Sequence, residues 1–410
     1  MRIGIQARLS AMMFLQFFVW GAWYTTVAVY MSGRGMADLT HWPYTVNPIA
    51  AIAAPFFLGL IADRYFSTEK VLGCLHLAGG LVMLAVPQAS GAPVAFIGLL
   101  LLYNLCYMPT LGLANSLAFH NIGDQEKQFP LIRVFGTLGW IVAGLFISFG
   151  LGRLVDGLPE ETPLPLYTAA GASLLLGLYS FTLPHTPPPA AGEKVSVRSI
   201  LGLDALRQLG SRPFWVFLAS SFLLCIPLAA YYNFTQLFLS ASGFGNIAGT
   251  QTLGQMSEVI FMLLMPLFFV RLGVKGMLLV GMAAWALRYV LFAAGAPDSV
   301  TWMILLGIVL HGICYDFFFV TGQIYVDKKS VPAIRGQAQG MLVLATYGAG
   351  MLIGAQVAGN VYNSFLGTAS TLSLDQWRSF WLFPAGFTVV VMVLFAVSFR
   401  DRVPTDEEVT

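Results

Sequence analysis

The chain has 410 residues, of which 57% are hydrophobic and only 10% are charged, and its formal net charge is +2. A soluble protein of this length needs far more charge on its surface, so the composition excludes a soluble globular protein and indicates an integral membrane protein. The small net charge gives no reason to expect a nucleic-acid partner. The four cysteines all lie in apolar runs without metal-ligand spacing, so we expect neither a disulfide framework nor a metal site.

Apolar segments long enough to span a bilayer recur along the whole chain. A bilayer core about 30 Å thick is crossed by about 20 helical residues, and we expect helices because lipid leaves no partner for an open backbone. Twelve such segments are predicted, with approximate limits 9–31, 42–62, 70–87, 93–119, 129–152, 164–183, 213–239, 247–270, 276–295, 299–325, 337–365 and 377–399.

The positive charge of the loops is strongly biased to one side of the predicted membrane. Sixteen lysines and arginines fall on that side, whereas the other side has three, namely Arg34, Arg153 and Arg378. Because positively charged loops stay in the cytoplasm, both termini of this multi-pass membrane protein are predicted to be cytoplasmic.

The longest connection, 184–212, divides the predicted spans into two sets of six. It begins "PHTPPPAAGEKVSVRS" and is polar and rich in proline. We therefore predict an all-α membrane protein with an N-terminal six-helix bundle at 1–183, a cytoplasmic linker at 184–212 and a C-terminal six-helix bundle at 213–410. Two pseudo-symmetric halves of this kind predict a substrate site between them.

An internal repeat supports the two halves. The loop "GLIADRYFSTEKVL" after the second span has its counterpart in "PLFFVRLGVKGMLL" after the eighth, with Arg64 matching Arg271. The first loop resembles the GxLaDRxG loop of the major facilitator superfamily through Gly59, Asp63 and Arg64, with Phe66 in place of the usual glycine. The resemblance implies a conformational-switch loop formed by these residues and Arg271. The alternative is ordinary charge beside the membrane.

Glu258 stands in the middle of the apolar eighth span. Gln251, Gln255 and Glu258 are spaced i, i+4 and i+7, which places them on one helical face. Placing an ionisable residue at this depth of the bilayer costs at least about 2.5 kcal/mol, so we expect Glu258 to have a functional role. The face is expected to line a protein interior or a water-filled cavity, and the alternative is a hydrogen-bond clamp between helices.

Asp316 is a second ionisable residue inside an apolar span, the tenth. It stands in "HGICYDFFFV" beside His311 and Tyr315. A buried aspartate needs a cation, a hydrogen-bond donor or a proton. It is therefore a candidate for proton binding, and the alternative is a pairing with Arg288 of the ninth span.

The fifth and seventh spans add further polar groups. Arg133, Thr137 and Trp140 lie on one face of the fifth span, although Arg133 is close enough to the cytoplasmic end for its head group to reach the interface instead. Asn233 lies in the seventh span, where polar contacts between helices are a common alternative. Amides, carboxylates and aromatic rings together favour a receptor for a planar neutral molecule that carries hydroxyl groups.

Several blocks make the chain similar to the nucleoside:proton symporters of the major facilitator superfamily. They are "FFVWGAWYTT", "LIRVFGTLGW", "QMSE", "HGICYDFF" and "VDKKSVPAIRGQAQGM". The resemblance implies proton-coupled nucleoside uptake by alternating access, with the nucleoside between the halves. It also implies substrate contacts at the matching positions Arg133, Thr137, Asn233, Gln255, Glu258 and Asp316, with proton linkage at the two acids.

The chain departs from the family pattern at four positions. Ala230 replaces a glutamine, His311 replaces a tyrosine, and Trp140 and Tyr315 stand where phenylalanines are usual. We include the last three among the expected substrate-binding residues. The departures leave open a different base, a nucleoside analogue or another small polar solute, such as a sugar or drug.

The remaining expectations concern partners and chemistry. Neither a catalytic residue nor a cofactor is expected, because the one long loop holds no catalytic cluster that a membrane-embedded enzyme would need. The expected partners are a nucleoside, protons and the lipid bilayer, and the expected state is a monomer. A sensory receptor of the same fold is a further alternative.

Overall fold

Helices and short connections make up the described part of the chain. The computed structural model describes residues 3–58, 65–188, 201–331 and 334–400. Within these ranges there is no β-strand. The predicted all-α fold class is therefore confirmed.

Nine helical stretches of the described residues are long and apolar enough to cross a membrane. They are Gly4–Gly33, Thr68–Ala89, Pro93–His120, Lys127–Arg153, Arg212–Ala241, Ile247–Gly295, Thr301–Lys329, Arg335–Leu366 and Leu374–Ser398. The helix α12 (Ile247–Gly295) has 49 residues and comprises the predicted eighth and ninth spans, joined at a kink. The helices α3 (Pro43–Phe57) and α8 (Leu164–Ser180) lie at the second and sixth predicted spans.

The kink in α12 depends on Gly273. Its backbone angles are φ 59° and ψ −179°, a combination that is essentially restricted to glycine. Gly273 occupies the position in the second loop of the repeat that Phe66 occupies in the first. The glycine that is missing from the first loop is thus present in the second, where it separates the two membrane-crossing parts of α12.

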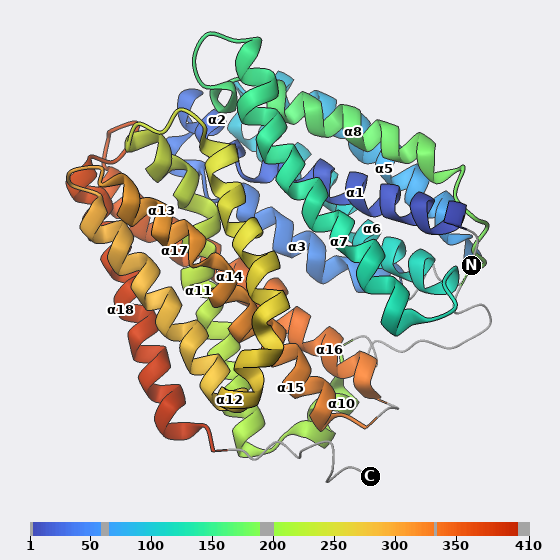
Figure 1. Cartoon of the computed structure of the whole chain (residues 1–410). Coiled ribbons are helices and arrows are strands. Elements are labelled where there is room, and N and C mark those ends of the chain that lie inside the picture. The colour runs from blue at the N-terminus through green and yellow to red at the C-terminus, as the bar shows by residue number, and fades with distance from the viewer. Residues whose placement is uncertain (1–2, 59–64, 189–200, 332–333, 401–410) are drawn as a thin grey trace. The chain divides into compact units, whose positions relative to one another are not determined.

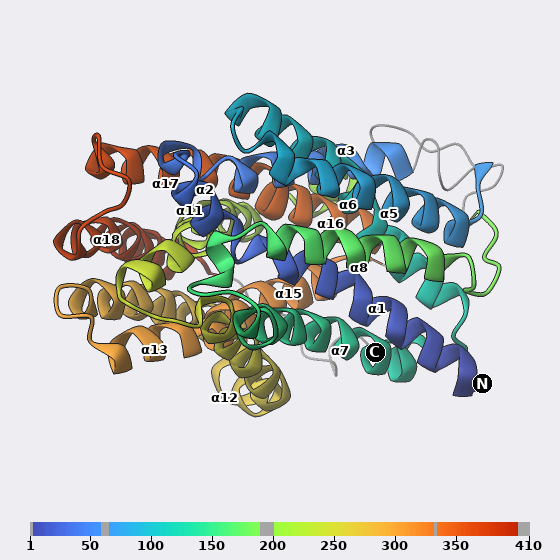
Figure 2. The same ribbon diagram turned by 90° about the horizontal axis from the view of Figure 1, so that it is seen from above.

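The described residues form two compact units. Unit 1 comprises the helices from α1 to α8 together with residues 244–252 at the start of α12. Its other helices are α1 (Ile3–Tyr24), α2 (Val27–Gly33), α5 (Thr68–Ala85), α6 (Pro93–His120) and α7 (Gln125–Leu145), with short turns η1 (Ala37–Leu39), η3 (Val86–Ala89), η4 (Phe146–Gly150), η5 (Leu151–Arg153) and η6 (Pro159–Glu161). Figure 2 shows α1 between α7 and α8, and it packs against both.

A buried hydrogen-bond network joins four helices inside unit 1. The ring of His76 lies 2.9 Å from Gln16 Oε1 and 3.1 Å from Ser173 Oγ. Gln16 Nε2 donates to Thr110 Oγ1 over 2.7 Å, and the Tyr107 hydroxyl donates to the Gln16 carbonyl over 2.6 Å. Each of these polar side chains has a partner, as a buried polar group requires. The network therefore fixes α1, α5, α6 and α8 against one another.

Unit 2 contains the rest of α12 and the other helices that follow residue 200 (Figure 1). They are α10 (Leu203–Leu209), α11 (Arg212–Ala241), α13 (Thr301–Val309), α14 (His311–Tyr315), the π-helical turn η7 (Asp316–Val320), α15 (Thr321–Lys329), α16 (Arg335–Val343), the π-helical turn η9 (Leu344–Gly350), α17 (Met351–Leu366) and α18 (Leu374–Ser398). α11 packs against both α17 and α18. The predicted boundaries 1–183, 184–212 and 213–410 stay predictions, and residues 189–200 of the linker are outside the described residues.

Candidate functional site

Asp316 begins a π-helical turn in the middle of the tenth predicted span. The α-helical segment α14 ends at Tyr315, and η7 follows from Asp316 to Val320. A π-turn widens the helix by one residue and is frequent at functional sites. Asp316 is fully buried, and neither of its carboxylate oxygens has a hydrogen-bond partner among the described residues.

Close packing of α12 on α14 brings the two intramembrane acids into one region of unit 2. The Gly312 amide donates to Ser257 Oγ over 2.9 Å, and Ser257 Oγ donates to the Val309 carbonyl over 2.6 Å. This contact lies next to Glu258, which is half-buried and interacts electrostatically with Asp316. Two carboxylates on neighbouring helices in an apolar interior can compete for a proton.

Polar atoms without partners are common among the predicted residues of unit 2. Besides Asp316, they include both amide atoms of Asn233, Oε1 of Gln255 and Nδ1 of His311. Buried polar groups are nearly always hydrogen-bonded, so each exception needs an explanation. A role in binding a polar ligand explains why these groups have no partner within the protein.

His311 is surrounded by aromatic rings. The ring of Tyr231 stacks on it with centroids 5.2 Å apart and planes at 16°, and Tyr232 meets it edge-on at 5.9 Å. Tyr315 lies 5.8 Å away on the same helix. His311 and Tyr315, which were predicted from sequence, are therefore close together, and Tyr231 is a neighbour that the sequence did not single out.

The three predicted residues of unit 1 lie on α7. The guanidinium carbon of Arg133 lies 4.2 Å from the centre of the Phe17 ring on α1. One face of Trp140 packs on Gly21, and its ring lies 5.4 Å from that of Trp20. Arg133, Thr137 and Trp140 are all half-buried. They form a polar and aromatic strip beside α1.

The predicted switch loop is described only in its second copy. Gly59, Asp63 and Arg64 lie outside the described residues. Arg271 is exposed, two residues before the kink at Gly273. The switch role of this loop stays a prediction.

Two details differ from the sequence expectations. Gln251 belongs to unit 1, where its Nε2 donates to the Thr25 carbonyl over 3.1 Å, whereas Gln255 and Glu258, on the same face of α12, belong to unit 2. Arg288 does not pair with Asp316, because neither carboxylate oxygen of Asp316 has a hydrogen-bond partner among the described residues. The guanidinium instead lies 4.1 Å from the centre of the Tyr231 ring.

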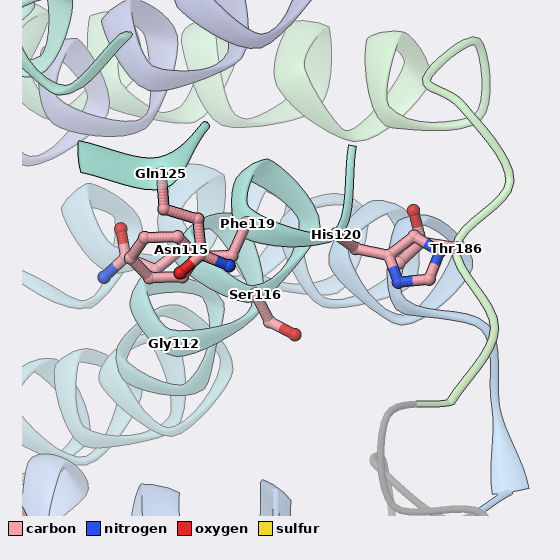
Figure 3. A pocket seen from close by; sticks show the side chains of 7 residues that line it. All are labelled: Gly112, Asn115, Ser116, Phe119, His120, Gln125 and Thr186. Atoms are coloured by element: carbon pink, nitrogen blue, oxygen red, sulfur yellow. The ribbon is translucent and has the colours of Figure 1, made fainter. Parts of the chain in front are cut away.

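A separate cavity of about 470 Å³ lies in unit 1. Its lining comes from α6, the first residue of α7 and the segment after α8 (Figure 3). The lining residues are Gly112, Asn115, Ser116, Phe119, His120, Gln125 and Thr186. None of the predicted substrate-binding residues is among them, so the cavity gives no support to a substrate site there.

Comparison with known proteins decides the family. The family model described as "Nucleoside H+ symporter" matches residues 3–403. The chain belongs to this family. Family members are membrane transporters of the major facilitator superfamily and not enzymes.

Three relatives from Escherichia coli (strain K12) cover nearly the whole chain. YegT is 42% identical over 98% of this chain and 95% of its own length. The nucleoside permease NupG is 32% identical over 98% of each chain, and the xanthosine permease is 31% identical over 97% and 96%. The nucleoside:proton symporter family suggested by the sequence motifs is therefore confirmed.

Solved structures confirm the fold. The crystal structure of the nucleoside transporter NupG matches 98% of this chain and 100% of its own, with a TM-score of 0.83 and 30% identity. The peptide transporter PepTSo matches with a TM-score of 0.73 at 13% identity over 96% and 97% of the two chains, which shows the fold alone. The prediction of twelve transmembrane helices in the major facilitator fold is thus confirmed.

Proposed function

We propose that this symporter-family protein takes up nucleosides across the inner membrane together with protons by alternating access. The substrate is held between the two six-helix bundles. The observation that carries the proposal is the pair of acids, Glu258 and Asp316, which interact inside unit 2 of a chain from a nucleoside:proton symporter family. Carboxylates at membrane depth are typical of proton relays and substrate sites in transporters.

The two acids have different proposed roles. Asp316 is the proton site, because it is fully buried and its carboxylate oxygens have no hydrogen-bond partner among the described residues. Glu258 is half-buried and receives the ribose hydroxyls, since one carboxylate can accept from two donors. The other proposed substrate contacts are Arg133, Thr137, Trp140, Asn233, Gln255, His311 and Tyr315.

Uptake into membrane vesicles tests the coupling. Labelled uridine or adenosine should accumulate when the outside is made acidic, and accumulation should collapse when a protonophore removes the gradient. The reason is that inward proton movement drives the substrate only if both are bound in the same cycle. Uptake that is indifferent to the gradient would contradict the coupling.

Single substitutions separate the two roles. Asp316→Asn should abolish gradient-driven accumulation while leaving exchange of nucleoside across the membrane. Glu258→Gln should weaken nucleoside binding about tenfold or more, because it removes hydrogen bonds to a charged acceptor. The matched controls Asp298→Asn and Glu161→Gln alter exposed acids and should behave as wild type. Full accumulation by Asp316→Asn would exclude it as the proton site.

A further inference from the structure

The first turn of α12 is held by residues that lie far from it in the sequence. The Ala248 amide donates to Glu160 Oε1 over 3.0 Å, and the Gly249 amide donates to Ser148 Oγ over 2.8 Å. The first amides of a helix have no partner within the helix, and the residue at the N-cap position usually supplies one. In α12 the acceptors come instead from η6 and η4, which lie 88 and 101 residues earlier in the chain.

The two acceptors are buried and bonded to each other. Ser148 Oγ donates to Glu160 Oε1 over 3.1 Å, so one carboxylate oxygen receives both the serine hydroxyl and the Ala248 amide. Glu160 is fully buried, and Ser148 is 4% exposed. A carboxylate at the positive end of a helix makes a charge-assisted hydrogen bond, which is stronger where water is excluded. We call Glu160 and Ser148, with the two amides that they accept, the Glu–Ser cap.

Glycines on both helices allow the first turn of α12 to approach α7 closely. A methyl group at Gly144 would lie 2.5 Å from Thr252 Cγ2 and 2.9 Å from the Ala248 carbonyl oxygen. A methyl group at Gly249 would lie 3.2 Å from Ser148 Cβ. The Glu–Ser cap therefore combines hydrogen bonding with close packing.

These contacts divide α12 between the two units. Residues 244–252 belong to unit 1, whereas Leu253 and the following residues of α12 belong to unit 2. Gln251 adds a further bond within unit 1, to the Thr25 carbonyl. In a chain with twelve spans, the end of the fifth and the start of the eighth lie on the membrane side opposite both termini. On that side, the first turn of α12 is therefore part of unit 1, although the helix continues in unit 2.

We infer that the Glu–Ser cap is a latch that must release before the side of the transporter opposite the termini can open. This inference rests on the proposed alternating access, in which the two halves of the chain move against each other around the substrate. Asn246 directly precedes α12, is exposed, and is of a residue type preferred at the N-cap position. It can accept from the first-turn amides once Glu160 and Ser148 are withdrawn. Release then costs less than two hydrogen bonds, which suits a contact that opens in every transport cycle.

A reversible cross-link tests whether the latch must release. A Cβ atom at Gly249 would lie 3.2 Å from Ser148 Cβ, close to the separation of about 3.5–4.5 Å found in disulfides. In the double variant Ser148→Cys/Gly249→Cys, oxidation should form a disulfide and reduce the uptake of labelled nucleoside into vesicles to background. Reduction of the disulfide should restore uptake. In each single variant, oxidation should leave uptake unchanged.

Alkylation of a buried cysteine measures release without transport. Thr252 is 2% exposed, so Thr252→Cys should react slowly with a hydrophilic maleimide in the purified full-length protein. Glu160→Ala should raise this rate about tenfold or more, because a hydrogen bond to a charged group is lost. Glu160→Gln keeps an acceptor oxygen and should raise the rate less. The labelling of protein that contains only the native cysteines is subtracted.

Two controls separate release of the latch from general destabilisation. Glu161→Ala removes the exposed acid next to Glu160 and should leave the alkylation rate of Thr252→Cys unchanged. Thr40→Cys alters a fully buried position in the connection between α2 and α3. It should react equally slowly with and without Glu160→Ala. A merely structural role of Glu160 would raise the rates at both positions together.

Three results would overturn the inference. The first is full uptake by the oxidised, cross-linked double variant, and the second is a folded double variant that forms no disulfide. The third is an alkylation rate of Thr252→Cys that Glu160→Ala does not raise selectively, which is measurable even if the double variant does not fold. If the wild type transports no nucleoside, the proposed function fails, whereas the alkylation rates still decide whether Glu160 holds the first turn of α12.

Discussion

Gly312 sets the distance between α12 and α14 at the level of a single residue. A methyl group at this position would lie 2.5 Å from the backbone carbonyl carbon of Ser257 and 2.7 Å from the Glu258 amide nitrogen. Backbone atoms cannot move aside as a flexible side chain can. The absence of a side chain at Gly312 is therefore what allows Glu258 and Asp316 to approach each other.

Gly312→Ala is expected to destabilise the protein by about 1–3 kcal/mol through overpacking and to impair uptake by separating the two acids. The measurements are Tm in detergent and labelled nucleoside uptake. The matched control is Gly171→Ala on α8, where an added methyl group meets nothing within 4 Å. This control should be neutral or gain up to about 1 kcal/mol of helix propensity. Equal effects of the two substitutions would contradict the packing argument.

His41 makes stability depend on pH outside the membrane-crossing helices. Burial lowers the pKa of its imidazole to about 4, although the Asp38 carboxylate acts in the opposite direction. The unfolded chain binds a proton near pH 6.5, so this contribution is complete above pH 6.5 and is lost as the pH falls towards 4, by about 3 kcal/mol in total. His41→Asn should lose less stability between pH 7 and 4.5 than wild type does. His120→Asn, at an exposed position, should retain the loss seen in wild type.

At the scale of elements, Lys275 ties the start of the ninth membrane-crossing segment to the end of α18. Its Nζ donates to the Ala396 and Phe399 carbonyls over 2.8 and 2.7 Å. The last carbonyls of a helix lack partners within the helix, and they carry partial negative charge. Lys275 therefore stabilises this end of α18 both by hydrogen bonding and by charge attraction.

Lys275→Met should therefore cost about 1–2 kcal/mol of stability, while Lys275→Arg should retain part of it. Lys70, its approximate counterpart in the first half of the chain, is exposed and provides the matched control Lys70→Met. Tm values in detergent decide the point. A loss of stability for Lys70→Met as large as that for Lys275→Met would remove the argument for helix capping.

The elements also show where sequence patterns were incomplete. The i, i+4, i+7 spacing of Gln251, Gln255 and Glu258 was correct as helix geometry, yet Gln251 bonds to the Thr25 carbonyl within unit 1. A helical face predicted from one segment does not identify which neighbours each turn of that segment meets. Likewise, no residue of "HGICYDFFFV" indicates that a π-helical turn begins at Asp316.

At the scale of the whole molecule, the orientation in the membrane stays a prediction from the distribution of lysine and arginine. Green fluorescent protein at the C-terminus should fluoresce, and alkaline phosphatase there should be inactive, because both report a cytoplasmic location. Alkaline phosphatase fused after Gly157, between the fifth and sixth spans, should be active. An active phosphatase at the C-terminus would reverse the orientation derived from the positive-inside rule.

The sequence alone determined the membrane class, the twelve spans, the family and the identity of the polar residues within the spans. Lipid imposes its requirement on each stretch of about 20 residues separately, so a one-dimensional pattern is sufficient for these features. Only the tertiary structure decided that Glu258 and Asp316 interact and that Arg288 contacts Tyr231 and not Asp316. Such pairings depend on the rotation of each helix about its axis and on how closely it packs against its neighbours. Both are set by contacts between segments far apart in the chain, such as the contact of Gly312 with Ser257.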